Sequence, residues 1–341
     1  MSSPSFHREA KRQSARGRCL HYGDGVRCNK IIAAHSIQKG GQLSLIAEDG
    51  HVYRLNADLS TLNRTDGLPH PKKAGVNQAS TFAGFCKYHD NALFKPIDTR
   101  PLAPDKQQAA LYAYRSLCRE FFVKENAVNV LEAVKADPNL DEAKRAHVES
   151  SLIGHSLGFE GLKYHKHYYD EALRKNDFDE FDFIYFGSKS RCSLQLSGLI
   201  YPDFDFIGSR LQDLGDWSSP LELLTFFTAP TTDGWAFGFA WHATSARACT
   251  LLVESLASRA SEEHWIQDAL LRFAFSCCEN HAFRISWWNG MSNQSQRAIL
   301  ERMLLMAHPN LPVPSNYLAT GCEGIADWSY EYVHTSLSTD A

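Results

Sequence analysis

Cys86 and His89, in "CKYHDNALF" (86–94), restrict what this chain can fold into more than any other feature. A gap of two residues lets one helical turn present both side chains to a single tetrahedral ion. Two further cysteines, Cys19 and Cys28, lie upstream in "CLHYGDGVRC". Three thiolates and one imidazole make a zinc-ligand set. The sequence therefore predicts a structural Zn²⁺ held by these four side chains.

The composition around these ligands supports a metal. Residues 19–98 have little helix signal, many Gly, His and turn residues, and few large apolar residues. A small unit of this kind commonly needs a metal to fold. The chain has nine cysteines. That odd number, and an N-terminus without a signal-peptide pattern, predict reduced thiols and a cytoplasmic location. The alternative is that Cys19 and Cys28 are small buried core residues.

The net charge of −4 gives no bulk attraction for nucleic acid, so any surface that binds it must be local. No apolar run approaches the roughly 20 residues that span a bilayer, so we expect no membrane partner. Residues 1–18 are polar and basic and are expected to form a flexible arm. Such an arm suits a phosphate backbone, and the alternative is a solvated tail.

Three shorter patterns organise the rest of residues 19–105. Alternation over 42–55, around Glu48-Asp49-Gly50, predicts a β-hairpin, and residues 56–80 have the composition of a loop. Asp90 and Asn91 fit the first turn of a short helix that Pro96 would stop. "DTRPLAPD" (98–105) is expected to be a linker.

Residues 106–335 predict a larger mixed α+β domain of unknown role. Apolar residues at helical spacing predict helices over 105–136, 140–175, 245–258, 262–280 and 292–307. Apolar runs predict strands over 181–187, 192–202, 221–230 and 234–243. We expect this domain to fold without the metal module. The apolar strand pair 221–243 is also compatible with one wall of a small-ligand pocket, as in a sensor. The acidic residues of 177–205 are expected to lie on the solvent-exposed faces of strands.

His35 is the second chemical feature of the chain. It follows Ile31-Ile32 in "IIAAHSIQKGG" (31–41), at the end of a short predicted strand. Neutral imidazole can take a proton from water near pH 7, and a divalent ion held by Asp90 can carry phosphate oxygens. This combination would hydrolyse phosphodiester bonds. The alternative is a strand histidine with a structural hydrogen bond.

"AAHSIQ", followed by a hairpin, a loop and "GFCKYHDNALF", resembles the HNH (ββα-metal) endonuclease module over about residues 19–97. The resemblance implies a small zinc-stapled ββα-metal module with His35 as the general base. Asp90 stands where the family's helix residue binds the catalytic Mg²⁺ or Mn²⁺, and Asn91 is a candidate for its asparagine. In a second register, His89 binds the catalytic metal and Cys86 is structural.

The chain departs from the family pattern at two positions near His35. Gln38 replaces a usual proline, and Ala34 replaces an Asp or His that binds metal in many members. The resemblance implies a metal-dependent nuclease, with DNA the favoured substrate and, by analogy, a role in defence against foreign DNA. The larger domain would bind a protein partner or a second copy. The alternative is a non-catalytic zinc-dependent protein that binds nucleic acid or another partner, with the larger domain as sensor.

Overall fold

The computed structural model describes residues 4–23, 25–56, 61, 65, 67–305 and 313–337. Its α-helices are α1 (Pro4–Ala15), α2 (Ser44–Ile46), α4 (Lys87–Asp98), α5 (Lys106–Lys135), α6 (Glu142–Lys175), α7 (Ala246–Ala257), α8 (Trp265–Cys277), α9 (Ile285–Gly290) and α10 (Asn293–Leu304). Two short helices of other types are η1 (Lys39–Leu43) and η2 (Ala243–Ser245). The strands are β1 (Ile31–His35), β2 (His51–Asn56), β3 (His70–Gly75), β4 (Thr81–Cys86), β5 (Phe181–Ser188), β6 (Leu194–Ile200), β7 (Leu224–Pro230), β8 (Trp235–His242), β9 (His281–Phe283) and β10 (Tyr332–Thr335).

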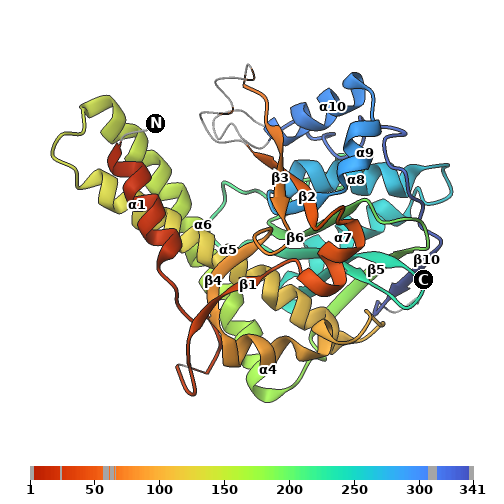
Figure 1. The fold of residues 1–341 in the computed structure, drawn as a ribbon, viewed down its shortest axis with the longest axis horizontal. Coiled ribbons are helices and arrows are strands. Elements are labelled where there is room, and N and C mark those ends of the chain that lie inside the picture. Colours follow the sequence, from red (N-terminus) through yellow and green to blue (C-terminus); the bar gives the residue numbers. More distant parts are fainter. Residues whose placement is uncertain are drawn as a thin grey trace.

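The chain is a mixed α+β protein, as the sequence predicts. An eight-stranded sheet has the order β10-β5-β8-β7-β6-β9-β2-β3, and β1 and β4 form a separate two-stranded sheet. The long helices α5 and α6 lie beside the sheets and extend to one side, with α1 along them (Figure 1). In the described residues, no helix is both long and apolar enough to cross a membrane.

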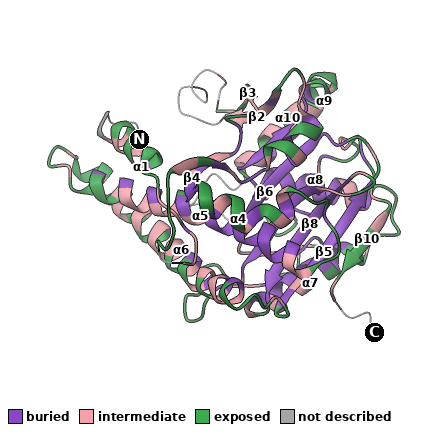
Figure 2. Ribbon diagram, turned by 60° about the horizontal axis from the view of Figure 1, so that its bottom comes forward, coloured by how far each residue is buried: buried purple, intermediate pink, exposed green. Residues whose placement is uncertain are grey.

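The predicted helices and strands of the larger part are confirmed. Asp105 caps α5 by accepting hydrogen bonds from the backbone of Gln107 at 2.7 Å and Gln108 at 3.2 Å. Helix α6 is continuous and ends at Asn176 in the left-handed region, with φ of 52°. Strands β7 and β8, predicted over 221–230 and 234–243, pair as an antiparallel hairpin, and β8 is buried along its whole length (Figure 2).

The predicted hairpin over 42–55 is wrong in its first half. Residues 39–46 are helical, and only the second half is a strand, β2. Leu43 and Ile46 are both fully buried, and their spacing of three places them on one helical face that an alternating strand would split. Strand β2 pairs instead with β3, which lies inside the predicted loop 56–80. Helix α4 also continues past Pro96 to Asp98.

Residues 19–97 share their sheet and cores with the larger part, which corrects the expectation of two independent cores. Strand β2 joins the large sheet through β9, with Tyr53 opposite Phe283. Val52 packs in the same core as the buried side chains of β6, β7 and α8. The segment 98–105 does connect α4 to α5, but Leu102 within it is buried and donates its N–H to the Pro230 carbonyl at 2.7 Å.

The expected flexible arm is largely the helix α1. Phe6 and Ala10 are four residues apart and pack against Val130 and Val134 of α5, because one helical turn brings them onto the same face. Arg18 also has a structural use. Its guanidinium pairs with Glu125 and lies 4.1 Å from the centre of the Phe122 ring. Residues 1–3 of the predicted arm lie outside the described residues.

Candidate metal centre

Cys19, Cys28, Cys86 and His89 converge as predicted. Their ligand atoms all lie within 4.8 Å of one another. Nδ1 of His89 is 3.4 Å from Sγ of Cys19, 3.5 Å from Sγ of Cys28 and 3.4 Å from Sγ of Cys86. A tetrahedral zinc ion, with a Zn–S bond of about 2.3 Å and a Zn–N bond of about 2.0 Å, separates nitrogen and sulfur by about 3.5 Å. The cluster can hold a metal ion and is compatible with zinc.

Cys86 and His89 are positioned by the junction between β4 and α4. Cys86 is the N-cap of α4, and its Sγ lies 3.5 Å from the backbone N–H of His89. The positive end of a helix favours a thiolate at this position. The backbone N–H of Lys87 donates to the Lys30 carbonyl at 2.9 Å, which fastens the chain after Cys28 to the same junction.

Cys19 and Cys28 are brought together by a tight loop, although eight residues separate them. The N–H of Cys28 donates to the Gly25 carbonyl at 3.1 Å, and the φ of Gly25 is 80°, which favours glycine. On the other side, Leu20 donates its N–H to the Gly84 carbonyl at 2.8 Å, so this strand-like segment follows β4. The loop therefore folds back on Cys19 without a CxxC spacing. Asp24, between Cys19 and Cys28, lies outside the described residues.

The surroundings of His89 fix its ring. His89 is buried and its ring stacks on that of His21, with 3.8 Å between the ring centres and 4° between the planes. A hydrogen bond with the backbone of Val26 also acts on the His89 imidazole. Such contacts orient a metal-binding histidine. Burial, with the nearby Cys19 thiol, raises the pKa of Cys28 to about 11, and a bound cation would offset this cost of ionisation.

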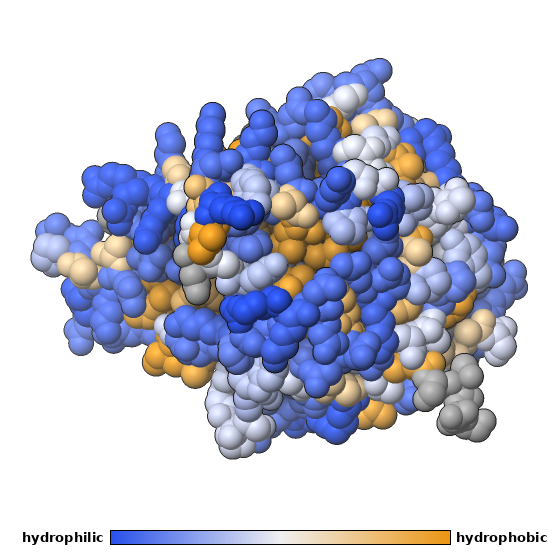
Figure 3. All heavy atoms as spheres, turned by 90° about the horizontal axis from the view of Figure 1, so that it is seen from below, coloured by the Kyte–Doolittle hydropathy of each residue, from blue (hydrophilic) through white to orange (hydrophobic). Residues whose placement is uncertain are grey.

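A cavity of about 610 Å³ opens beside the cluster, between residues 21–23 and 26–27 and helices α4, α5 and α6. Helix α4 lies at the lower edge of the molecule in Figure 1. Seen from below, this face is mostly hydrophilic, with apolar side chains gathered near its middle (Figure 3). The cavity beside the cluster has polar side chains such as His21 and Arg27 in its lining, together with apolar ones such as Leu93 and Leu111.

His35 ends β1, as predicted, and is half-buried. Its Nε2 lies 3.0 Å from the Val76 carbonyl, so Nε2 carries the proton and Nδ1 keeps the lone pair. Burial is the main cause that lowers the pKa of His35, and the hydrogen bond to Val76 opposes it. The imidazole is therefore neutral at pH 7, the protonation state that a general base needs.

Asp90 lies in the first turn of α4 and is half-buried, whereas Asn91 beside it is exposed. Burial raises the pKa of Asp90, against the charge of Arg115. Within the described residues, the Cys/His cluster is the one group of three or more metal-ligating side chains that converges. The structure therefore does not bring Asp90 into a second ligand set. The acidic residues of 177–205 form no such set either.

His35 and the Cys/His cluster lie at opposite ends of the two-stranded sheet formed by β1 and β4. In the register of the two strands, Ile31 faces Cys86 and His35 faces Thr81. Asp90 is one helical turn from Cys86, near the N-terminal end of α4. His35, Asp90 and Asn91 therefore lie on one strand pair and on the helix that follows it.

Arg115 and Asp98 are two residues near His35 that the sequence reasoning missed. They form a bidentate ion pair with N–O distances of 2.8 Å and 2.9 Å, and the Arg115 side chain is only 3% exposed. Arg115 also lies 4.1 Å from the centre of the Phe94 ring. The charges of both residues act on the pKa values of His35 and Asp90. The only signal was the spacing of four between Asp90, Phe94 and Asp98, which puts them on one helix face.

Comparisons of this chain with family models, with curated proteins and with solved structures found no match. The function is therefore argued from the residues of the site.

Proposed function

We propose that this protein is a metal-dependent nuclease that hydrolyses phosphodiester bonds, with DNA as the favoured substrate. The observation that supports this best is the ββα unit around His35. Strands β1 and β4 are antiparallel, α4 follows β4 without a break, and the Cys/His cluster lies at that junction. His35 ends the first strand of this unit, with Nδ1 available as a proton acceptor.

In the proposed reaction, Nδ1 of His35 accepts a proton from water while the water oxygen attacks phosphorus. The P–O bond to one sugar oxygen breaks, and the leaving oxygen takes a proton from solvent. Asp90 would hold a Mg²⁺ or Mn²⁺ ion, which supplies charge stabilisation to the phosphate oxygens, with Asn91 beside it as a further polar ligand. The zinc cluster has a separate, structural role because it fixes the start of α4.

A second candidate is a non-catalytic zinc-dependent protein that binds nucleic acid or another partner. One observation favours it: Asp90 has no converging partner ligands among the described residues. Ala34, beside His35, supplies no metal ligand. In this alternative, the ββα unit keeps its zinc and its binding surface, and the rest of the chain carries the sensing role.

Incubation with nucleic acid separates the two candidates. We would mix the purified full-length protein with plasmid, single-stranded DNA, linear duplex DNA and RNA, with Mg²⁺, with Mn²⁺ or with neither. The nuclease proposal expects cleavage of DNA that depends on the added ion. Binding of DNA without cleavage under all of these conditions would favour the non-catalytic candidate. If the protein neither cleaves nor binds any of these nucleic acids, both candidates are contradicted.

A further inference from the structure

A cavity of about 310 Å³ lies at one end of the large sheet, away from the metal centre. Strands β5, β8 and β10 form its walls, together with the turn between β7 and β8. The segment 102–104, which connects α4 to α5, forms another side. This volume is at the lower end of the range for small-molecule sites in proteins. The strand pair 221–243, singled out in the sequence, supplies part of it.

Tyr185 of β5 lines this cavity and has an unused hydrogen-bonding group. Tyr185 is only 2% exposed, and its hydroxyl oxygen has no hydrogen-bond partner. Leaving a buried hydroxyl without a partner destabilises the fold, so such a group is usually satisfied by water or by a ligand. A ligand with a polar end inside the cavity would satisfy it.

Three further contacts give the cavity a fixed shape. The ring of Tyr332 lies against Gly187, at a place where any larger side chain would collide with it. The Tyr332 hydroxyl lies 3.2 Å from Oγ1 of Thr231, which holds the ring across the turn. On the opposite side, the hydrogen bond from Leu102 to Pro230 holds the 102–104 segment in place. Between these walls the apolar surface is preformed.

The cavity also has one cationic and one anionic side chain on neighbouring turns. Ser188 faces Trp235 in the pairing of β5 with β8, so Lys189, just after β5, and Asp233, just before β8, lie at the same end of the sheet. Both line the cavity. Among the ion pairs of the described residues, none joins Lys189 to Asp233. The two opposite charges are therefore available to a ligand that carries both signs.

We propose that this cavity binds a free α-amino acid with a polar tip on its side chain. The carboxylate of the amino acid pairs with Lys189 and its ammonium group pairs with Asp233. Its side chain lies between the rings of Tyr185 and Tyr332, and the polar tip bonds to the Tyr185 hydroxyl. This binding site is independent of the proposed nuclease activity and would give the larger part of the chain a sensing role.

The test is isothermal titration of the full-length protein with each of the free amino acids. We expect one or a few polar-tipped amino acids to bind. The N-acetyl derivative of the best ligand, which lacks the ammonium group, and its carboxamide, which lacks the carboxylate, should each bind at least about 10-fold more weakly. Absence of binding by every free amino acid would overturn the proposal. Equal binding of either derivative would also overturn it.

Two variants test the contacts. Asp233→Asn should weaken binding about 10-fold, while Asp216→Asn, an exposed control on another loop, should leave it unchanged. Tyr185→Phe should fold normally, because its hydroxyl has no partner to lose. It should weaken binding of the polar-tipped ligand but not of an isosteric ligand without the polar tip. If Tyr185→Phe and Asp233→Asn both bind as the wild type does, the ligand is elsewhere and the proposal fails.

Discussion

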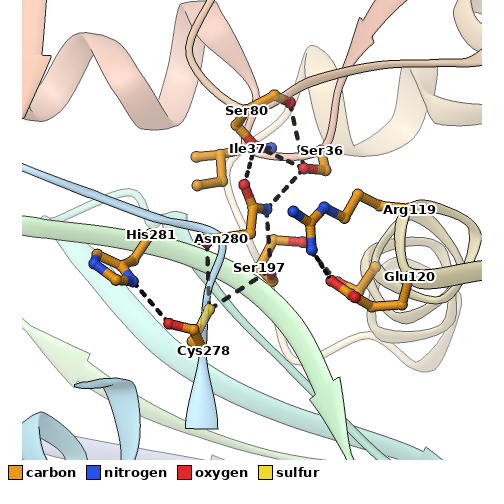
Figure 4. A network of polar contacts seen from close by, with 10 residues as sticks. Ser36, Ile37, Ser80, Arg119, Glu120, Ser197, Cys278, Asn280 and His281 are labelled. Atoms are coloured by element: carbon orange, nitrogen blue, oxygen red, sulfur yellow. Dashed lines mark hydrogen bonds and ion pairs between the residues drawn. The ribbon is translucent and has the colours of Figure 1, made fainter. Parts of the chain in front are cut away.

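Asn280 donates its side-chain amide to the Ser36 hydroxyl at 2.9 Å and thereby joins positions separated by most of the chain. The same amide donates to the Ser197 carbonyl of β6 at 3.0 Å, and its Oδ1 accepts from the Ser80 hydroxyl at 2.9 Å. Asn280 is 1% exposed. Figure 4 shows it between the chain that follows His35 and the large sheet. This one side chain therefore couples the ββα unit to the rest of the fold.

Asn280→Ala should lower the free energy of unfolding by about 3 kcal/mol, because buried donors and acceptors on both sides lose their partner. Urea unfolding followed by circular dichroism measures this. Asn293→Ala, at an exposed position at the start of α10, is the matched control and should change stability by less than about 0.5 kcal/mol. Equal stability of the two variants would show that the network does not stabilise the fold.

The shared sheet predicts that a fragment from residue 104 to the C-terminus is not cooperatively folded. This is the opposite of the expectation from sequence. The fragment loses β2 and β3 from the sheet edge and leaves β9 exposed. It also loses the side chains of Val52 and Ile46 from the main core. Circular dichroism and thermal unfolding of the fragment decide the matter. A sharp transition like that of the full chain would contradict this prediction.

The purified protein should carry about one zinc ion per chain, because the ligand set and its spacing suit that ion. Cys86→Ser should release the zinc and loosen the start of α4, since metal binding and local folding are coupled. Cys118→Ser changes a buried cysteine outside the cluster and should keep the zinc. Elemental analysis of wild type and both variants measures this. Wild-type protein without zinc, never exposed to a chelator, would refute the metal centre.

Two buried histidines predict a loss of stability in acid. Burial is the main cause that lowers the pKa of His165, and that of His281, to about 4. In the unfolded chain the pKa is about 6.5, so between these values protons bind the unfolded state more readily. Each histidine therefore contributes up to about 3 kcal/mol of stability above pH 6.5, which is lost as the pH falls towards 4.

Urea unfolding at pH 7.5, 6.0 and 5.0 checks this. His165→Gln should make stability fall less steeply with decreasing pH than in the wild type. His167→Gln changes an exposed histidine two residues further along α6, and should keep the wild-type slope. If His165→Gln and the wild type lose stability in parallel, His165 is not responsible.

The sequence predicted those features that depend on local spacing. The two-residue gap between Cys86 and His89 and the helical periodicity of α5 are visible in short windows. The contacts that decide the architecture join distant segments. Strand β2 meets β9 through the single register pair of Tyr53 with Phe283. Arg115 and Asp98 belong to different helices, so no local pattern marks them as partners. The same limit applies to α1, because its apolar residues are buried only by packing against α5, which is distant in the sequence.

His35→Ala should reduce metal-dependent DNA cleavage by about 10²- to 10⁴-fold, the usual cost of removing a general base. Zinc content and DNA binding should not change, because His35 lies at the opposite end of β1 from the cluster. His70→Ala is the matched control, an exposed histidine on β3. Asp90→Ala should raise the Mg²⁺ or Mn²⁺ concentration needed for half-maximal cleavage and leave zinc bound. Gel assays over a metal titration measure both effects. If His35→Ala cuts DNA as fast as His70→Ala does, the base lies elsewhere.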